Sequence, residues 1–176
     1  KMLNLAARSI NNTIGFDDGP FPPDHRGDVN LIGAVCCGAR LDGVLSARVR
    51  RDGVNATDRI AAIVEGSRFH AQLQLVLLQG IAVAGFNVID IHTLNRRLGL
   101  PVVVVVRHEP DLDAIRTALL DNVPGGRRKW RLIEQAGALV SAAGVWLQCS
   151  GVELEHASET VGRLAIHGTI PEPLRL

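Results

Sequence analysis

The stretch QLQLVLLQGIAVAGFNVIDIHTLNRRLGLPVVVVVR, residues 72–107, decides the fold of this chain. It holds two runs of branched apolar residues, at 73–78 and 102–106, which are typical of strands covered on both faces. A helix-like segment, residues 87–98, lies between them. A strand, a helix and a strand in close order predict a parallel crossover unit. Ligands of α/β proteins commonly bind where such strands end, which makes the pair Gln79-Gly80 a candidate site.

Further strands and helices are predicted on both sides of this unit. Upstream, we expect strands at residues 10–16, 29–37 and 41–49, the last two as a hairpin, and then a helix that Asn55 or Thr57 caps and that reaches about residue 69. Downstream, we expect a helix at 110–120, a strand at 145–149, a helix at 152–164 and an extended end at 171–173, whereas residues 129–135 fit either a strand or a helix. This order predicts an α/β fold of the ribonuclease H-like layout: a mixed sheet with an antiparallel three-strand start, parallel α/β units and helices on both faces.

Composition sets the broad class. The chain has 176 residues, of which 47% are hydrophobic, and this favours one compact domain over residues 1–176. No apolar run is long enough to cross a membrane and no secretory segment is recognisable, so a cytoplasmic protein is expected. The net charge of +1 does not demand a nucleic-acid partner. Arginine-rich clusters at 48–51, 96–97 and 127–129 are either phosphate contacts or solvated surface.

The spacing of the cysteines and histidines argues against a function carried by cysteine or histidine chemistry. Cys36, Cys37 and Cys149 form no CxxC pair and have no Cys/His spacing suited to zinc, so inert reduced thiols are expected. The six histidines form no HxH or HExxH pattern, and there is no GxSxG motif for a serine nucleophile.

Carboxylates are the better candidates. In the predicted layout, the end of the first strand, the entrance to the first helix and the end of the central strand meet at one edge. These places hold Asp17 with Asp18, then Asp52 or Asp58, and Gln79. Clustered carboxylates repel one another unless a cation neutralises them, and Mg²⁺ binds one or two carboxylates together with water and substrate phosphate. Such a cation activates water for attack on a phosphodiester.

Each acidic residue also has a purely structural interpretation. Residues 17–20, Asp-Asp-Gly-Pro, have the composition of an ordinary turn, and so does Asp52-Gly53. Asp58 fits a first-turn helix charge. Asp90 faces either the site or the solvent.

Several longer strings resemble one family. They are GFDDGPF at 15–21, LDGVL at 41–45, DGVNAT at 52–57, QGIAVAGFNVIDI at 79–91, GLPVVVVVR at 99–107 and PEPLR at 171–175. Together they resemble the archaeal endonuclease dU family, which is similar to endonuclease V. The resemblance implies a ribonuclease H-like fold and a divalent-metal-dependent nuclease that acts on deaminated DNA, with deoxyuridine as the proposed lesion.

The resemblance also implies roles for single residues. Gly15-Phe16-Asp17 is similar to the strand of endonuclease V that carries its first metal-binding aspartate, and Gln79-Gly80 stands at its VDG-like aspartate. Residues 100–107 are similar to its strand that ends in a basic residue near the scissile phosphate, which is Arg107 here. The chain ends at Leu176, and members of the family typically continue into a further helix and a tail rich in glycine and arginine.

Gln79 departs from the family pattern, because both families usually carry aspartate there. Glutamine still offers a carbonyl oxygen but removes one negative charge from a cation site. Asn55 is a second position where an acid is common. Replacement oxygens are available in the sequence at Asp18, Asp90 and Glu65.

The leading hypothesis is therefore an endonuclease-like protein with Asp17, Asp52, Gln79 and Arg107 as catalytic residues and Asp17, Asp18 and Asp52 as ligands of Mg²⁺ or Mn²⁺. The loop at 80–86 would receive an extruded base, with Gly80, Gly85, Phe86 and Asn87 as substrate contacts. The expected partner is DNA, or RNA, with deaminated bases, and an oligomer is compatible with the sequence. Two alternatives stay open: a non-catalytic nucleic-acid-binding module, and an apolar-surfaced oligomeric scaffold.

Overall fold

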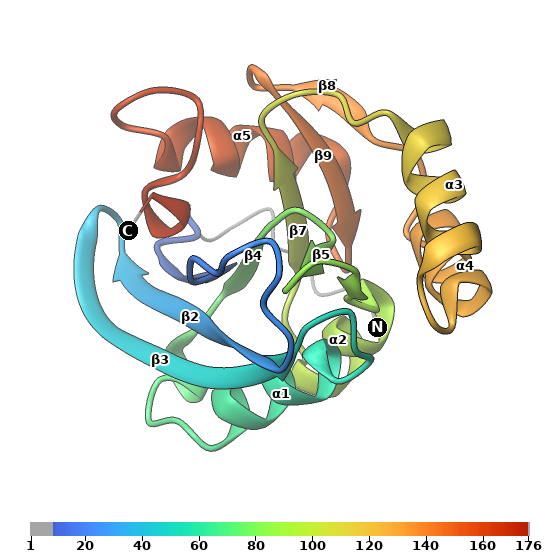
Figure 1. Ribbon diagram of the computed structural model, residues 1–176. Coiled ribbons are helices and arrows are strands. Elements are labelled where there is room, and N and C mark those ends of the chain that lie inside the picture. Colours follow the sequence, from blue (N-terminus) through green and yellow to red (C-terminus); the bar gives the residue numbers. More distant parts are fainter. Residues whose placement is uncertain (1–8, 176) are drawn as a thin grey trace.

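A seven-stranded mixed sheet forms the centre of the computed structural model, which describes residues 9–175 (Figure 1). The strand order is β3-β2-β1-β4-β7-β9-β8. The strands are β1 Asn12–Asp18, β2 Asp28–Cys37, β3 Arg40–Arg50, β4 Leu75–Gln79, β7 Val102–Val106, β8 Val140–Ala142 and β9 Val145–Ser150. A separate two-stranded ribbon pairs β5, Ala82–Val83, with β6, Asn87–Val88. The helices are α1 Ala56–Glu65, α2 Ile91–Leu98, α3 Leu112–Asn122, α4 Gly126–Gln135 and α5 Leu154–Leu164.

Strand directions match the predicted layout in its first part. β3, β2 and β1 are antiparallel neighbours, and β1, β4 and β7 are parallel neighbours. The antiparallel start and the parallel crossover from β4 through α2 to β7 are therefore confirmed. β9 runs antiparallel to β7, because it follows β8 in an antiparallel hairpin and β8 has the same direction as β7.

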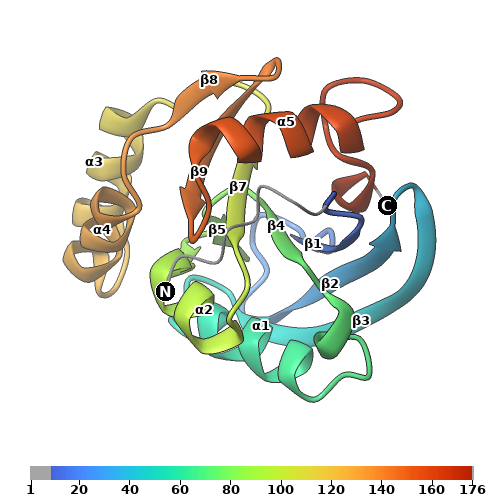
Figure 2. The same ribbon diagram turned by 180° about the vertical axis from the view of Figure 1, so that it is seen from behind.

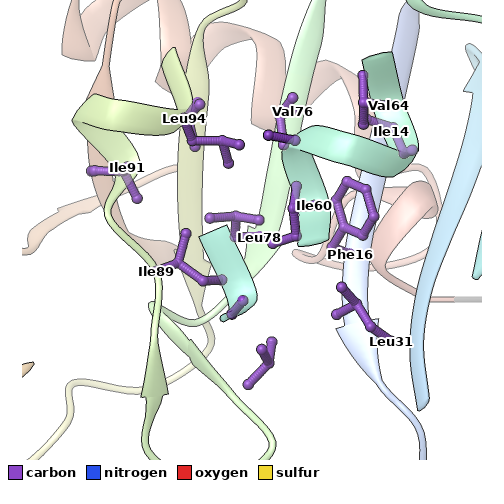
Figure 3. Close-up of a cluster of buried hydrophobic side chains, with 14 of the residues drawn as sticks. Ile14, Phe16, Leu31, Ile60, Val64, Val76, Leu78, Ile89, Ile91 and Leu94 are labelled. Atoms are coloured by element: carbon purple, nitrogen blue, oxygen red, sulfur yellow. The ribbon is translucent and has the colours of Figure 1, made fainter. Parts of the chain in front are cut away.

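Helices cover both faces of the sheet (Figures 1 and 2). On one face, Phe16 and Leu78 of the strands share a buried cluster with Ile60 of α1 and Leu94 of α2 (Figure 3). On the other face, a second cluster joins the strands to α5; it includes Leu75, Leu77, Val103, Val105, Ala157 and Val161. Because β4 and β7 are buried on both sides, their sequences are continuous apolar runs instead of alternating ones.

The α3–α4 pair lies beside the sheet and packs on the β5–β6 ribbon (Figure 1). Val88 of β6, Leu119 of α3 and Ile133 of α4 form its small core. The two helices approach closely where α4 begins, since a Cβ added at Gly126 would lie 1.8 Å from the backbone oxygen of Leu119. Residues 129–135, which fit either structure in the sequence, belong to α4.

Several chain segments differ from the predicted boundaries. The helix expected to reach about residue 69 ends at Glu65, and residues 87–88 of the predicted helix at 87–98 form β6. The first strand extends through Asp18, so Asp17 and Asp18 belong to β1 and the turn-only interpretation of these two residues is wrong. Residues Glu172–Leu174 form a 3-10 turn where an extended end was expected. This turn packs on β1, because a Cβ at Gly15 would lie only 2.5 Å from the backbone oxygen of Pro173.

Cysteine chemistry agrees with the expectation of inert thiols. Cys36, Cys37 and Cys149 are free, and burial raises the pKa of both Cys36 and Cys149 to about 11. Thiolates are therefore scarce at neutral pH at these two positions. Over residues 9–175, none of the helices has the length and apolar character that a bilayer crossing requires.

Candidate functional site

Asp17 and Gln79 are brought together by the register between β1 and β4. The two strands are parallel neighbours, with Phe16 opposite Leu78, and both of these side chains enter the core beneath α1. Successive side chains of a strand point to opposite faces, so the next residues, Asp17 and Gln79, both turn to the α5 face of the sheet. Neighbouring strands lie about 4.8 Å apart. Two predicted site residues thus adjoin at the edge where the parallel strands end.

Asp17 is an unusual carboxylate in this position. It is half-buried, and loss of solvation is the main reason that its pKa rises from 3.8 to about 6. The backbone N–H of Asp18 donates to its Oδ1 over 2.9 Å and lowers the pKa, whereas the negative charge of Asp18 raises it. Among the described residues, no basic side chain forms an ion pair with Asp17. A desolvated acid without a cation is suited to bind one or to exchange a proton.

Asp18 and Asp52 have a different task, because they hold the loop that follows β4. Asp18 Oδ2 accepts a hydrogen bond from the backbone N–H of Ala84 over 2.5 Å. The backbone N–H of Asp52 donates to the oxygen of Ala84 over 2.9 Å, and Asp52 Oδ1 accepts from the N–H of Phe86 over 2.8 Å. Hydrogen bonds from backbone N–H groups to carboxylates are among the stronger ones in proteins. Residues 80–86, called the site loop below, are therefore fixed by two acidic side chains.

The close approach at Gly85 shows how tightly this loop is held. Gly85 has a φ of +78°, and a Cβ there would lie 2.4 Å from Asp52 Oδ1. Asp52 itself has a φ of +51° and Ala84 one of +49°, a region that residues other than glycine rarely adopt. Backbone strain of this kind persists only where the surroundings impose it. The contacts between Asp52 and the site loop supply that constraint.

Lys129 was missed as a structural element of the site. The sequence placed it in a surface-like basic cluster, but its side chain is only 2% exposed. Its Nζ donates to the backbone oxygen of Asp52, and burial lowers its pKa. The signal was available in the helical spacing of the buried α4 residues Gly126, Lys129 and Ile133. Lys129 joins α4 to the strained residue that holds the site loop.

Asn87 also supports the backbone instead of facing a ligand. It is fully buried, and its Nδ2 donates to the backbone oxygen of Arg50 and to Asn55 Oδ1, each over 2.9 Å. Its Oδ1 accepts from the N–H of Ala56 over 3.0 Å. The expected substrate contact by Asn87 is thus replaced by a structural link from β6 to the start of α1. Asn55 belongs to the same network, because its Oδ1 accepts hydrogen bonds from the backbone N–H of Arg50 and from Asn87 Nδ2.

The other candidate replacements for a missing acid are engaged elsewhere. Asp90 caps α2, with its carboxylate accepting from the N–H and hydroxyl of Thr93 over 3.0 and 2.8 Å. Glu65 pairs with Arg97 at 2.9 Å. Neither Asp90 nor Glu65 is free to supply the negative charge that Gln79 lacks. Asp58, the sequence alternative to Asp52, also pairs with Arg97, at 3.2 Å. Arg107, by contrast, is exposed directly after the last residue of β7, which is the strand beside β4.

The donor set determines which cation the site can accept. Asp17, Asp18 and Asp52 do not converge, and within residues 9–175 there is no group of three or more His, Cys, Asp or Glu side chains placed to hold a metal. The carboxylates of Asp17 and Asp18 lie close enough that the charge and side chain of Asp18 raise the pKa of Asp17, whereas Asp18 and Asp52 are engaged by the backbone of the site loop. What remains is the unpaired Asp17 carboxylate and the amide oxygen of Gln79. Two protein oxygens suit a hard cation that keeps several waters and gains substrate phosphate.

Comparison with known proteins gives a consistent family match. The endonuclease dU family model matches residues 10–176. A UPF0215 protein of Deinococcus radiodurans is 54% identical over 166 residues, which are 94% of this chain and 84% of that protein. A UPF0215 protein of Methanothermobacter thermautotrophicus is 44% identical over 181 residues, covering 99% of this chain and 89% of the relative.

Solved structures show the same fold. A protein of unknown function from Archaeoglobus fulgidus superposes with a TM-score of 0.87 at 31% identity, over 93% of this chain and 92% of that one. Endonuclease V of Ciona intestinalis, crystallised with a 24mer DNA containing an inosine, gives a TM-score of 0.59 at 12% identity, over 94% and 82% of the two chains. Endonuclease V has a ribonuclease H-like fold, so the predicted fold class is confirmed.

Substitution of Gly85 tests the contact between Asp52 and the site loop. Gly85→Ala should lower the free energy of unfolding by about 1 to 2 kcal/mol more than Gly99→Ala, as measured by urea denaturation. Both glycines have positive φ, but nothing lies within 4 Å of a Cβ at Gly99, so that variant isolates the backbone cost. Equal losses in the two variants would show that Asp52 does not constrain the loop.

The raised pKa of Asp17 predicts a stability that depends on pH. Because the folded-state pKa of about 6 lies above 3.8, Asp17 contributes stability that is fully present below pH 4 and is lost as pH rises through 6. In EDTA, Asp17→Asn should therefore match the wild type near pH 4 and be more stable by about 1 to 2 kcal/mol at pH 7, a value reduced for partial exposure. Asp113→Asn on the exposed face of α3 controls for charge. A constant difference between Asp17→Asn and wild type across this range would contradict the assignment.

Proposed function

Because this chain belongs to the endonuclease dU family, we propose that it is a divalent-metal-dependent endonuclease that acts on DNA containing deaminated bases, deoxyuridine in particular. The observation that carries the proposal is the pairing of the desolvated Asp17 with Gln79 at the carboxyl edge of the parallel strands. That edge is the usual ligand site of an α/β sheet. The DNA with inosine bound to the structurally similar endonuclease V supports the substrate class.

The chain's own residues divide the work of cleavage. Asp17 and the amide oxygen of Gln79 would hold Mg²⁺ or Mn²⁺, which supplies activation of water and neutralisation of the phosphodiester charge when bound. Arg107 is exposed at the end of β7, the β-strand next to that of Gln79. It would bind a phosphate oxygen of the nucleic-acid strand that is cut. Asp52 acts on the site loop in this scheme, not on the cation.

The site loop is proposed to receive the damaged base. Its residues 81–85, Ile-Ala-Val-Ala-Gly, are small or apolar, so backbone groups can approach an extruded base closely. Extrusion costs least at a mismatched or deaminated base. Gly80, Gly85 and Phe86 are the proposed base contacts, and the bonds from Asp18 and Asp52 keep the loop rigid before the base arrives. A rigid pocket lowers the entropic cost of binding.

A non-catalytic binding module is the second candidate. Gln79 favours it, because one anionic ligand is missing from a site where the described residues form no three-carboxylate cluster. Lower negative charge weakens the attraction for a hard cation. In this form, the protein would recognise deaminated nucleic acid through the site loop without cutting it.

Restoring the acid separates the two candidates. Gln79→Asp should raise nicking of a uracil-containing duplex by roughly tenfold or more at limiting Mn²⁺, since it returns a charged ligand. Gln72→Asp, which adds the same charge on the exposed turn before β4, should leave the rate unchanged. Asp17→Asn should abolish nicking in either background. Retained binding with no nicking by the wild type or by Gln79→Asp would reject the endonuclease and support the module.

A further inference from the structure

A cavity of about 300 Å³ lies between the β1–β2 connection and the end of β3. It is separate from the Asp17–Gln79 pair, which does not line it. Three arginines line it, Arg26, Arg50 and Arg51, and its other charged lining residues are Asp24 and Asp52. The cavity therefore collects more positive than negative charge.

Arg51 is held in place before any ligand is present. Its Nη1 donates to the backbone oxygens of Pro23 and His25, and its guanidinium lies 5.5 Å from the ring centre of Phe21. Its Nε is buried without a hydrogen-bond acceptor, with Asp52 Oδ2 at 3.6 Å. These contacts fix the side chain of Arg51 at the border of the cavity.

The other two arginines also have unused donors. Arg50 is 62% exposed in its side chain, and its nearest carboxylate oxygen, Asp28 Oδ1, is 3.9 Å away. Within residues 9–175, Arg26 makes neither a side-chain hydrogen bond nor an ion pair. Asp28 and Asp52 neutralise Arg50 and Arg51 only at 3.9 and 3.6 Å, so the three arginines keep donors for an anion. Phosphate fits this demand, because guanidinium groups bind its oxygens in a fixed fork geometry.

We propose that this cavity is a subsite for a phosphate group of the nucleic-acid strand, remote from the phosphate that is cut. The inference rests on the proposed function for its ligand. Parallel and antiparallel pairing places the end of β3, which carries Arg50, at the same sheet edge as the ends of β1 and β4. From β1 to β3 there are two strand spacings, or about 10 Å, and Arg50 lies about 13 Å further along the strands than Asp17, because it is opposite Asp28 whereas Asp17 is opposite Ile32. The combined distance of roughly 17 Å is about five times the 3.4 Å axial rise per nucleotide of one DNA strand.

Asp52 connects this subsite to the site loop. Its Oδ2 lies toward Arg51 beside the cavity, while its Oδ1 accepts the N–H of Phe86. A strand that placed one phosphate in the cavity would bring its charge next to the residue that fixes the proposed base pocket. The subsite would thereby set which nucleotide of the strand reaches the pocket.

Salt dependence of DNA binding tests the subsite without any cleavage. Affinity for a uracil-containing duplex is measured in EDTA over a range of salt concentrations. Arg26→Gln/Arg50→Gln should reduce the magnitude of the slope of log K against log salt by about 0.9, the value for one phosphate contact. Arg51 stays unchanged because it holds the β1–β2 connection. The control Arg40→Gln/Arg68→Gln removes the same charge from exposed positions at the opposite edge, beside the start of β3 and before β4.

Each outcome decides the matter. A smaller slope in the first variant alone supports the subsite, and equal slopes in both variants overturn it, as does a wild type that binds no DNA. A titration with inorganic phosphate, followed by the amide chemical shifts of Gly27 and Arg51, distinguishes a site for free phosphate from a site for a nucleic-acid phosphate. If phosphate changes these shifts but the variant leaves the slope for DNA binding unchanged, the nucleic-acid ligand is rejected. If the wild type nicks DNA but Arg26→Gln/Arg50→Gln keeps the wild-type slope, only the subsite is rejected. If the slope changes but the wild type does not nick DNA, only the cleavage reaction is rejected.

Discussion

The parallel pairing of β1 with β4 is the constraint on which the site depends. Phe16 and Leu78 face each other in this register and are both buried beneath α1, which fixes the register by the hydrophobic effect. A slip by one residue would move these apolar side chains out of the core and turn Asp17 into it. The cost of that slip is therefore far greater than the cost of holding one desolvated carboxylate. The packing of Phe16 and Leu78 on one face of the sheet thus positions Asp17 and Gln79 on the other face.

Hydrogen bonding then divides the acidic residues between two tasks. Asp17 adjoins Gln79 and is left without a cationic partner among the described residues, whereas the neighbouring Asp18 carboxylate binds the site loop. Asp52 reaches the same loop from the end of β3 and is held by Lys129 from α4. Three parts of the chain that are distant in sequence thus define one rigid loop. A short loop with three positive-φ residues, Gly80, Ala84 and Gly85, needs such external support to keep one conformation.

The sequence predicted the elements well and the side-chain partners poorly. Continuous apolar runs identified β4 and β7, and their spacing identified the crossover through α2, because both signals are local. The three-carboxylate cluster was not found, because its prediction needed the end of β1 to within one residue, and the strand ends two residues later than expected. Asn87 and Lys129 were misjudged because polar residues are usually exposed, and their partners, Arg50 and Asp52, lie 37 and 77 residues away. The direction of β9 depends on its hairpin with β8, a short strand that was not predicted from the sequence.

Manganese diffraction tests the central claim most directly, that Asp17 and Gln79 form a cation site on the α5 face of the sheet. Crystals of the wild-type protein soaked in Mn²⁺ should show one anomalous peak within coordination distance of an Asp17 carboxylate oxygen and the Gln79 amide oxygen, about 2.1 to 2.3 Å for a hard cation of this size. Asp18 and Asp52 should keep their bonds to Ala84 and Phe86 in the same crystal. A peak held by Asp18 and Asp52 instead, with Asp17 uninvolved, would contradict the account.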